Sequence, residues 1–241
     1  MTGYLVFSME EFYQRSAGYL KDAVYAANDG IVTTFAVVAG VVGASLDPLV
    51  ILILGFANLF SDGFSMATGS FLGSRSEAQM YRKERKIQER EMEKQVEKER
   101  KDVEDILAEK GYEAAQLQRL TDMIMENKEF AIDLLMDEKI GVLKPEDGQA
   151  TWGALVTFFS FILAGFVPLL PYVLIGGSAY KFLYAILFTA LALFVVGAAR
   201  IIFTGRNLFF SGFEMLFVGG IAAAIAYGVG ALLQQLITGL M

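Results

Sequence analysis

Hydrophobic residues in this chain gather into five long runs. Two runs precede a polar insertion and three follow it, at residues 23–45, 49–73, 152–175, 180–203 and 213–237. Because about 20 apolar residues in a helix cover the hydrocarbon core of a bilayer, each run is long enough to cross a membrane. The pattern therefore predicts an all-α integral membrane protein with five transmembrane helices.

The polar insertion divides the chain into three parts. Of the 47 charged residues, 35 lie between Arg75 and Asp147, and 20 of those 35 are acidic. We therefore expect a lead-in and two spans in residues 1–73, a separate helical domain in residues 74–148, and three spans in residues 149–241. Nucleic acid would require a basic surface, so it is excluded as a partner, whereas an acidic surface suits cations.

The chain contains no Cys and no His. This composition excludes disulfides, thiolate zinc sites, haem ligation by His or Cys, and His or Cys catalysis. We expect neither an enzyme nor a prosthetic group, and any metal ion would be bound by oxygen atoms and Met sulfur. Glu10 and Glu11 stand where a signal peptide would be basic, so the N-terminus is predicted to be an amphipathic lead-in.

Basic residues in the connections predict the orientation of the spans. Arg15 and Lys21 precede the first span, 15 Lys and Arg residues lie in the insertion, and Arg200 and Arg206 lie between the fourth and fifth spans. The opposite side carries only Lys181. Since Lys and Arg accumulate on the cytoplasmic side, the N-terminus and the insertion are predicted to be cytoplasmic.

Five chemistry-bearing residues lie within the first two spans or at their edges. Asn28 and Asp29 belong to the first span, and Asn58, Asp62 and Met66 lie on one face of the second at four-residue spacing. Carboxylates are costly inside a membrane, so this set predicts a cation path. A structural role for Asp62 as a hydrogen-bonded carboxylate remains open. Glu214, at the start of the fifth span, is predicted to be structural and paired with an Arg of the preceding connection.

The insertion begins with a charged segment that is predicted to continue the second span as one helix to Gly111. Helices at 113–126 and 128–139 follow. If the first helix is unbroken, five acidic residues share one of its faces: Glu77, Glu84, Glu91, Asp102 and Glu109. Apolar residues beside this stripe fit a face that packs while presenting oxygen atoms. The pattern alone nevertheless favours the other reading, a solvated helix with Glu and Lys pairs.

Five motifs occur in order along the chain: DGIVTTFAVVAG, GFANLFSDGFSMATGSFLGSRSE, GFVPLLPY, GAARIIFTGRN and SGFEMLFVGGIAAAIAYGVG. Together they resemble the vacuolar iron transporter family. This resemblance implies a homodimeric antiporter of divalent metal ions and protons, with a cytosolic metal-binding domain between the second and third spans. It also implies that Asp29 and Met66 line the path. A family Glu falls on Asn58, so Asp62, one turn away, is the candidate replacement.

In the insertion the family's ligand positions are only partly kept. They fall on Gln88, Glu91, Asp102, Asp105, Leu135, Met136 and Lys139. At position 139 the metal-binding side chain of the family is therefore replaced by a lysine. The candidate ligands implied by the resemblance, with two nearby substitutes added, are Glu84, Glu91, Asp102, Asp105, Met136 and Glu138.

The expected function is proton-coupled export of Fe²⁺, and of Mn²⁺ or Zn²⁺ as further candidates, out of the cytoplasm. Oxygen ligands with one thioether suit these ions better than Mg²⁺ or Ca²⁺. The alternative is a membrane-anchored metal sensor or scaffold. The expected location is a prokaryotic plasma membrane, with the vacuolar membrane as the alternative.

Overall fold

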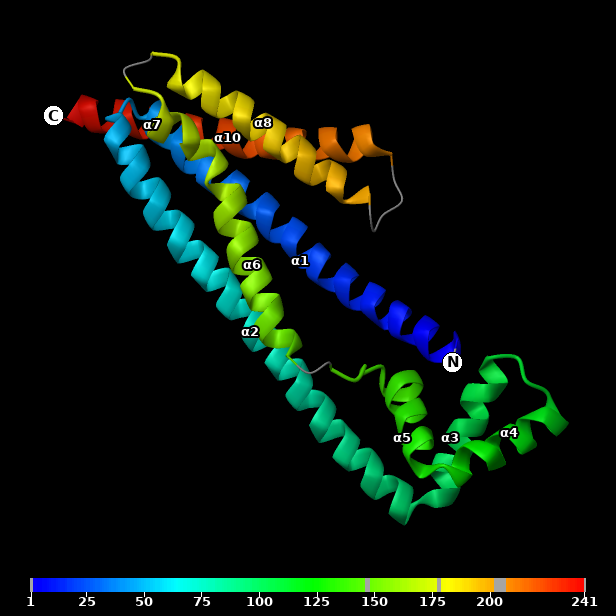
Figure 1. Ribbon diagram of the computed structural model, residues 1–241. Helices are drawn as coiled ribbons and strands as arrows, with labels where there is room; N and C mark the ends of the chain where they lie inside the picture. The colour runs from blue at the N-terminus through cyan, green and yellow to red at the C-terminus, as the bar shows by residue number, and fades with distance from the viewer. Residues whose placement is uncertain (1, 146–147, 177–178, 202–206, 241) are drawn as a thin grey trace. The chain divides into compact units, whose positions relative to one another are not determined.

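The computed structural model describes residues 2–145, 148–176, 179–201 and 207–240, with side chains from residue 18 onward. Every regular element within these ranges is a helix (Figure 1). Five helices are long and apolar enough to cross a membrane. The predicted all-α fold with five spans is therefore confirmed.

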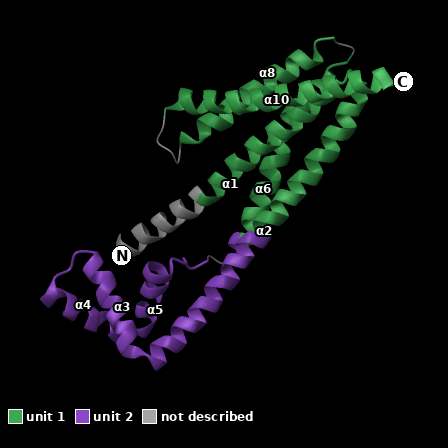
Figure 2. Ribbon diagram, turned by 180° about the vertical axis from the view of Figure 1, so that it is seen from behind, with its two compact units in different colours: residues 1–71, 150–241 green, residues 72–149 purple. Residues whose placement is uncertain are grey.

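The chain forms two compact units, which are coloured separately in Figure 2. The membrane unit comprises residues 1–71 and 150–241, and the polar unit comprises residues 72–149. The helix α2 belongs to both, since it runs without interruption from Pro48 to Lys94.

The membrane unit contains the apolar helices. Their bounds are α1 Thr2–Gly43, α2 Pro48–Lys94, α6 Gln149–Gly165, the 3₁₀ turn η2 Val167–Leu169, α7 Leu170–Leu174, α8 Lys181–Ala199 and α10 Leu208–Leu240. Between α1 and α2, Ser45 has a left-handed φ of 53°. The Leu49 N–H then donates to Asp47 Oδ1 at 2.7 Å, with Pro48 at the first helical position. This is the capping chemistry that begins a helix.

The third span differs from its prediction as a single helix over residues 152–175. The helix α6 ends at Gly165, and η2 and α7 complete the span. Pro168 and Pro171 lie in these two short elements. Because proline lacks the N–H that a helix interior uses, the two residues replace one regular helix with a broken one.

Small residues let the helices of this unit approach closely. A Cβ on Gly230 of α10 would collide with the carbonyl oxygen of Gly40 in α1. One on Gly43 of α1 would collide with the carbonyl oxygen of Tyr227 in α10. In contrast, a Cβ on Gly69 would meet nothing within 4 Å. The glycines thus let the backbones of α1 and α10 touch directly.

The polar unit is built from the second half of α2 and four further elements. These are α3 Val96–Glu109, α4 Ala114–Glu126, α5 Lys128–Leu135 and the π-helical turn η1 Met136–Ile140. Gly111 and Gly141 have left-handed φ angles of 90° and 73° where α3 and η1 end. Glycine adopts these angles without the steric cost that other residues meet.

The prediction of one unbroken charged helix to Gly111 is wrong. The helix ends at Lys94, Gln95 is non-helical with φ −134° and ψ 45°, and α3 begins at Val96. The predicted acidic face is therefore divided between two helices, with Glu77, Glu84 and Glu91 on α2, and Asp102 and Glu109 on α3.

The physical reason for the break is a hydrophobic core that forms within the polar unit. Tyr81 and Met92 of α2 pack with Val103, Ile106 and Leu107 of α3. The α5 and η1 residues Ala131, Ile132, Leu135 and Met136 complete this cluster. Burial of one large apolar side chain stabilises a fold by about 1.5–3 kcal/mol, so several of them outweigh the cost of interrupting a helix. A continuous helix would leave these side chains in water.

Candidate functional site

The membrane unit carries its predicted ligands on α1 and α2. Asn58, Asp62 and Met66 lie at four-residue intervals on α2, and all three are partly buried. Asp29 of α1 is also partly buried, and its negative charge lies near enough to that of Asp62 for the two to repel. The structure therefore brings two of the predicted carboxylates together from different helices. Neither forms an ion pair with any other described residue.

The α6 helix forms an apolar wall beside these carboxylates. A Cβ on Gly30, the residue after Asp29, would meet the backbone of Phe161. A Cβ on Gly63, the residue after Asp62, would lie 3.3 Å from the Phe161 ring. Phe161 is fully buried, so α6 packs closely against α1 and α2 next to the two carboxylates. A low-dielectric wall strengthens the electrostatic interactions of nearby charges.

Asn28 provides an additional oxygen atom next to Asp29. Its side-chain Oδ1 is buried and accepts no hydrogen bond from the described part of the chain. A buried acceptor without a partner costs about 1–3 kcal/mol, so this oxygen is available to a cation. In the sequence, Asn28 is one of the polar residues of the first two spans, but it is not among the candidate metal ligands predicted there.

Asp22 and Ser70 extend the polar positions along the same two helices. A Cβ on Gly153 of α6 would lie 3.7 Å from Asp22 Oδ2 and 3.8 Å from Ser70 Oγ, so α1, α2 and α6 meet at this point. Asp22 precedes Asp29 by seven residues, and Ser70 follows Met66 by four. Both spacings keep a residue on the same helix face. Sequence reasoning missed these residues because it considered only positions deep in the spans.

The polar unit does not bring its six predicted ligands together. Four of them are paired with lysines: Glu84 with Lys83 at 3.9 Å, Glu91 with Lys98 at 3.6 Å, Asp102 with Lys139 at 2.6 Å, and Glu138 with Lys110 at 2.6 Å. Asp105 is exposed on α3, and Met136 is buried in the apolar core. Across the described ranges, no group of three or more acidic side chains is placed to hold a metal ion.

Two of these lysines, Lys110 and Lys139, are held in their charged form by their partners. The hydrogen bond to Glu138 raises the pKa of Lys110 above its ordinary 10.5. Burial lowers the pKa of Lys139, but the hydrogen bond to Asp102 and the charge of Glu99 outweigh burial and raise it. A nearby opposite charge favours the ionised form of each group.

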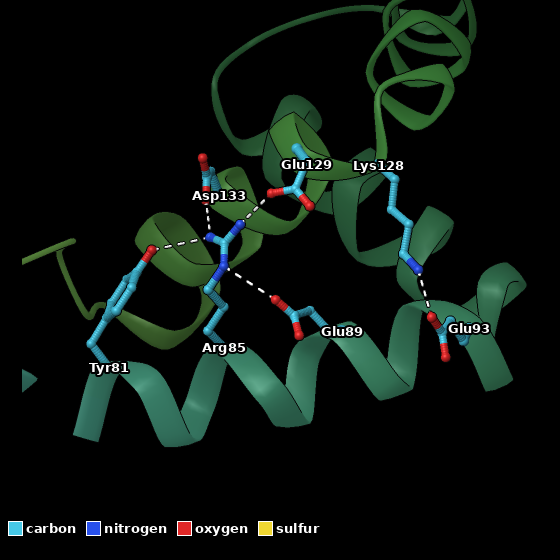
Figure 3. A network of polar contacts seen from close by, with 7 residues as sticks. All are labelled: Tyr81, Arg85, Glu89, Glu93, Lys128, Glu129 and Asp133. Carbon is cyan, nitrogen blue, oxygen red and sulfur yellow. Dashed lines mark hydrogen bonds and ion pairs between the residues drawn. The ribbon is translucent and has the colours of Figure 1, made fainter. Parts of the chain in front are cut away.

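Arg85 connects α2 to α5 in the same unit. Figure 3 shows its guanidinium donating to Asp133 and Glu129 of α5. It also donates to the Tyr81 hydroxyl at 3.1 Å and pairs with Glu89 Oε1 at 3.3 Å. The planar guanidinium can satisfy several oxygen atoms at once, so one side chain organises this interface.

The described sites lie within a region that matches a known family. The family model described as the VIT family matches residues 20–231. The chain belongs to the VIT family. It is 31% identical over 216 residues to vacuolar iron transporter 1 of Arabidopsis thaliana, covering 90% of this chain and 86% of the relative. It is also 33% identical over 237 residues to a vacuolar iron transporter of Toxoplasma gondii, covering 95% and 78%. The family resemblance is confirmed.

Proposed function

We propose that this VIT family member transports Fe²⁺ across its membrane through a site formed by Asp29, Asp62, Asn28 and Met66. The observation that carries the proposal is the pair of partly buried carboxylates on α1 and α2, whose charges repel and which form no ion pair in the described part of the chain. Like charges in a low-dielectric site favour uptake of a cation or a proton. The names of the relatives, vacuolar iron transporters, support iron as the cargo.

The ligand atoms of this proposed site also favour some divalent ions over others. Carboxylate and amide oxygens bind Fe²⁺ and Mn²⁺ readily, and a thioether adds a softer ligand that Mg²⁺ and Ca²⁺ do not use. Mn²⁺ is the second cargo in this proposal. Zn²⁺ binds such ligands at least as strongly as Fe²⁺, so it is expected to compete.

Proton exchange follows from the same two side chains. In this proposal the same two carboxyl groups carry protons back after the metal ion has left. The protein would then move metal out of the cytoplasm and return protons as a homodimer, as the family resemblance implies. The relatives' names support the vacuolar membrane over the plasma membrane that the sequence favoured. The sensor alternative has less support, because most predicted ligands of the polar unit are paired with lysines.

Transport by the purified full-length protein tests this proposal. Proteoliposomes with an acidic lumen would be given Fe²⁺ under reducing conditions, and uptake would be followed with a trapped chelating dye. We expect Asp29→Asn and Asp62→Asn to lose uptake. Glu214→Gln is the matched control, because Glu214 is also a span carboxylate but pairs with Arg200 at 3.5 Å, as predicted. Wild-type uptake by both Asp variants would refute the proposed site.

A further inference from the structure

Glu99 of α3 has no exposed surface, and it is the one acidic residue in the described part of the polar unit that is fully buried. The Gln88 side-chain amide of α2 donates to its Oε2 atom. Lys139 Nζ of η1 donates to the same oxygen at 3.3 Å, and Lys98 Nζ lies 3.6 Å from Oε1. A buried carboxylate costs several kcal/mol unless it is paired, so this site depends on its cationic partners.

Lys139 bridges two carboxylates rather than one. Its ammonium lies 2.6 Å from Asp102 Oδ2 as well as 3.3 Å from Glu99 Oε2. The ammonium therefore stands between oxygen atoms of two residues that are one turn apart on α3, where a bound cation would otherwise be expected. The π-helical turn Met136–Ile140 places it there, since Met136 in the same turn is buried in the core.

Ion pairs between basic and acidic side chains also join the other elements of this unit. Arg85 of α2 binds Glu129 and Asp133 of α5 (Figure 3), and Lys128 of α5 donates to Glu93 of α2 at 2.8 Å. Between α3 and α4, Arg100 donates to Asp122. Basic side chains of the chain itself thus neutralise acidic residues at each of these helix contacts.

We propose that Lys139 is a built-in cation that occupies the Glu99 and Asp102 site and keeps divalent metal ions out of the polar unit. The unit is assembled without metal, and metal binding by the whole protein is confined to the membrane unit. Replacing the ammonium with a carboxylate would leave three acidic side chains converging on one point. Such a set is the kind of oxygen site that Mn²⁺ prefers. The exclusion of metal from the polar unit does not depend on the proposed transport activity, whereas metal binding by the membrane unit rests on the proposed function.

Mn²⁺ binding by the full-length protein in detergent tests the proposal. We expect Lys139→Glu to bind one more Mn²⁺ per chain than the wild type in calorimetry. Lys110→Glu is the matched control, because it makes the same charge change in the same unit at the exposed pair with Glu138. An equal gain in both variants would overturn the proposal, as would loss of wild-type Mn²⁺ binding in Glu99→Gln.

A second variant covers the case in which Lys139→Glu fails to fold. Lys139→Gln leaves the two carboxylates without their ammonium, so backbone amides of α3 and η1 are expected to exchange with solvent faster. Added Mn²⁺ would restore their protection, measured by hydrogen exchange of the full-length protein. In the wild type, Mn²⁺ would leave the exchange of these segments unchanged. Protection of wild-type α3 by Mn²⁺ equal to that in the variant would contradict the proposal.

Discussion

The replacement Asp62→Asn is the most direct perturbation of the membrane site. It keeps the size of the side chain and removes one of the two charges that act on each other between α1 and α2. Asn58 lies one turn away on α2 and cannot replace that charge, since it is an amide. Asp29 would then be the only charged ligand of the proposed set for a dehydrated divalent ion.

The magnitude follows from Coulomb's law. Two unit charges about 4 Å apart interact by about 4 kcal/mol at an effective dielectric constant of about 20, and a divalent ion doubles this to about 8 kcal/mol. Loss of the repulsion between the two carboxylates returns up to about 4 kcal/mol. The net loss is therefore at least about 4 kcal/mol, which corresponds to a weakening of metal binding by about a thousandfold or more.

The assay measures both metal affinity and metal-driven proton movement in proteoliposomes. We expect Asp62→Asn to abolish both as completely as Asp29→Asn does. Adding Asn58→Glu to Asp62→Asn returns a carboxylate to the same face about 6 Å away, so partial recovery is expected. Unchanged affinity in Asp62→Asn would show that Asp62 is structural, and the reasoning from repulsion would fail.

Three further outcomes follow from the same structure. Met66→Leu keeps the volume but loses the sulfur, so it is expected to weaken Fe²⁺ transport more than Mn²⁺ transport and to leave proton coupling intact. Single cysteines at Ser8 and Gln118 are expected to react with reagents from the cytoplasmic side, and those at Asp47 and Thr238 from the opposite side; another partition would refute the orientation. The raised pKa of Lys139 means that its stabilising contribution is complete below its ordinary 10.5 and is lost as the pH rises through the higher folded value. The protection of α3 amides, relative to their intrinsic base-catalysed exchange at each pH, is therefore expected to fall in strongly alkaline solution, and to fall less in Lys139→Gln, which already lacks the charge.

The five spans could be predicted because membrane crossing depends on the length and hydrophobicity of local runs, which a sequence shows directly. The break at Gln95 could not, because the residues around it are ordinary helix formers without Gly or Pro. It is stabilised by the burial of Met92 and Val103, which lie on either side of the break and belong to one core. Tertiary packing overrides local preference at such a position.

The same distinction applies to the candidate sites. Asp29 and Asp62 could be predicted because a carboxylate is conspicuous in an apolar run. In the polar unit, acidic residues are common, and which of them meets a lysine depends on how α3 and η1 pack. Lys139 is 37 residues from Asp102 in the chain, so their 2.6 Å contact leaves no local signal.

The buried carboxylate of the polar unit has a cationic partner, whereas the two partly buried carboxylates of the proposed membrane site have none in the described part of the chain, and this contrast gives a last prediction. Lys139 neutralises Glu99, whereas Asp29 and Asp62 form no ion pair in the described part of the chain. A lysine at position 58, four residues before Asp62, can reach that carboxylate along the helix. Asn58→Lys is therefore expected to fill the membrane site with a fixed cation and abolish Fe²⁺ uptake, while the purified protein melts at the same or a higher temperature. Asn58→Gln is the control that keeps the amide and is expected to retain uptake. Wild-type uptake by Asn58→Lys would mean that the metal ion does not pass between Asp29 and Asp62.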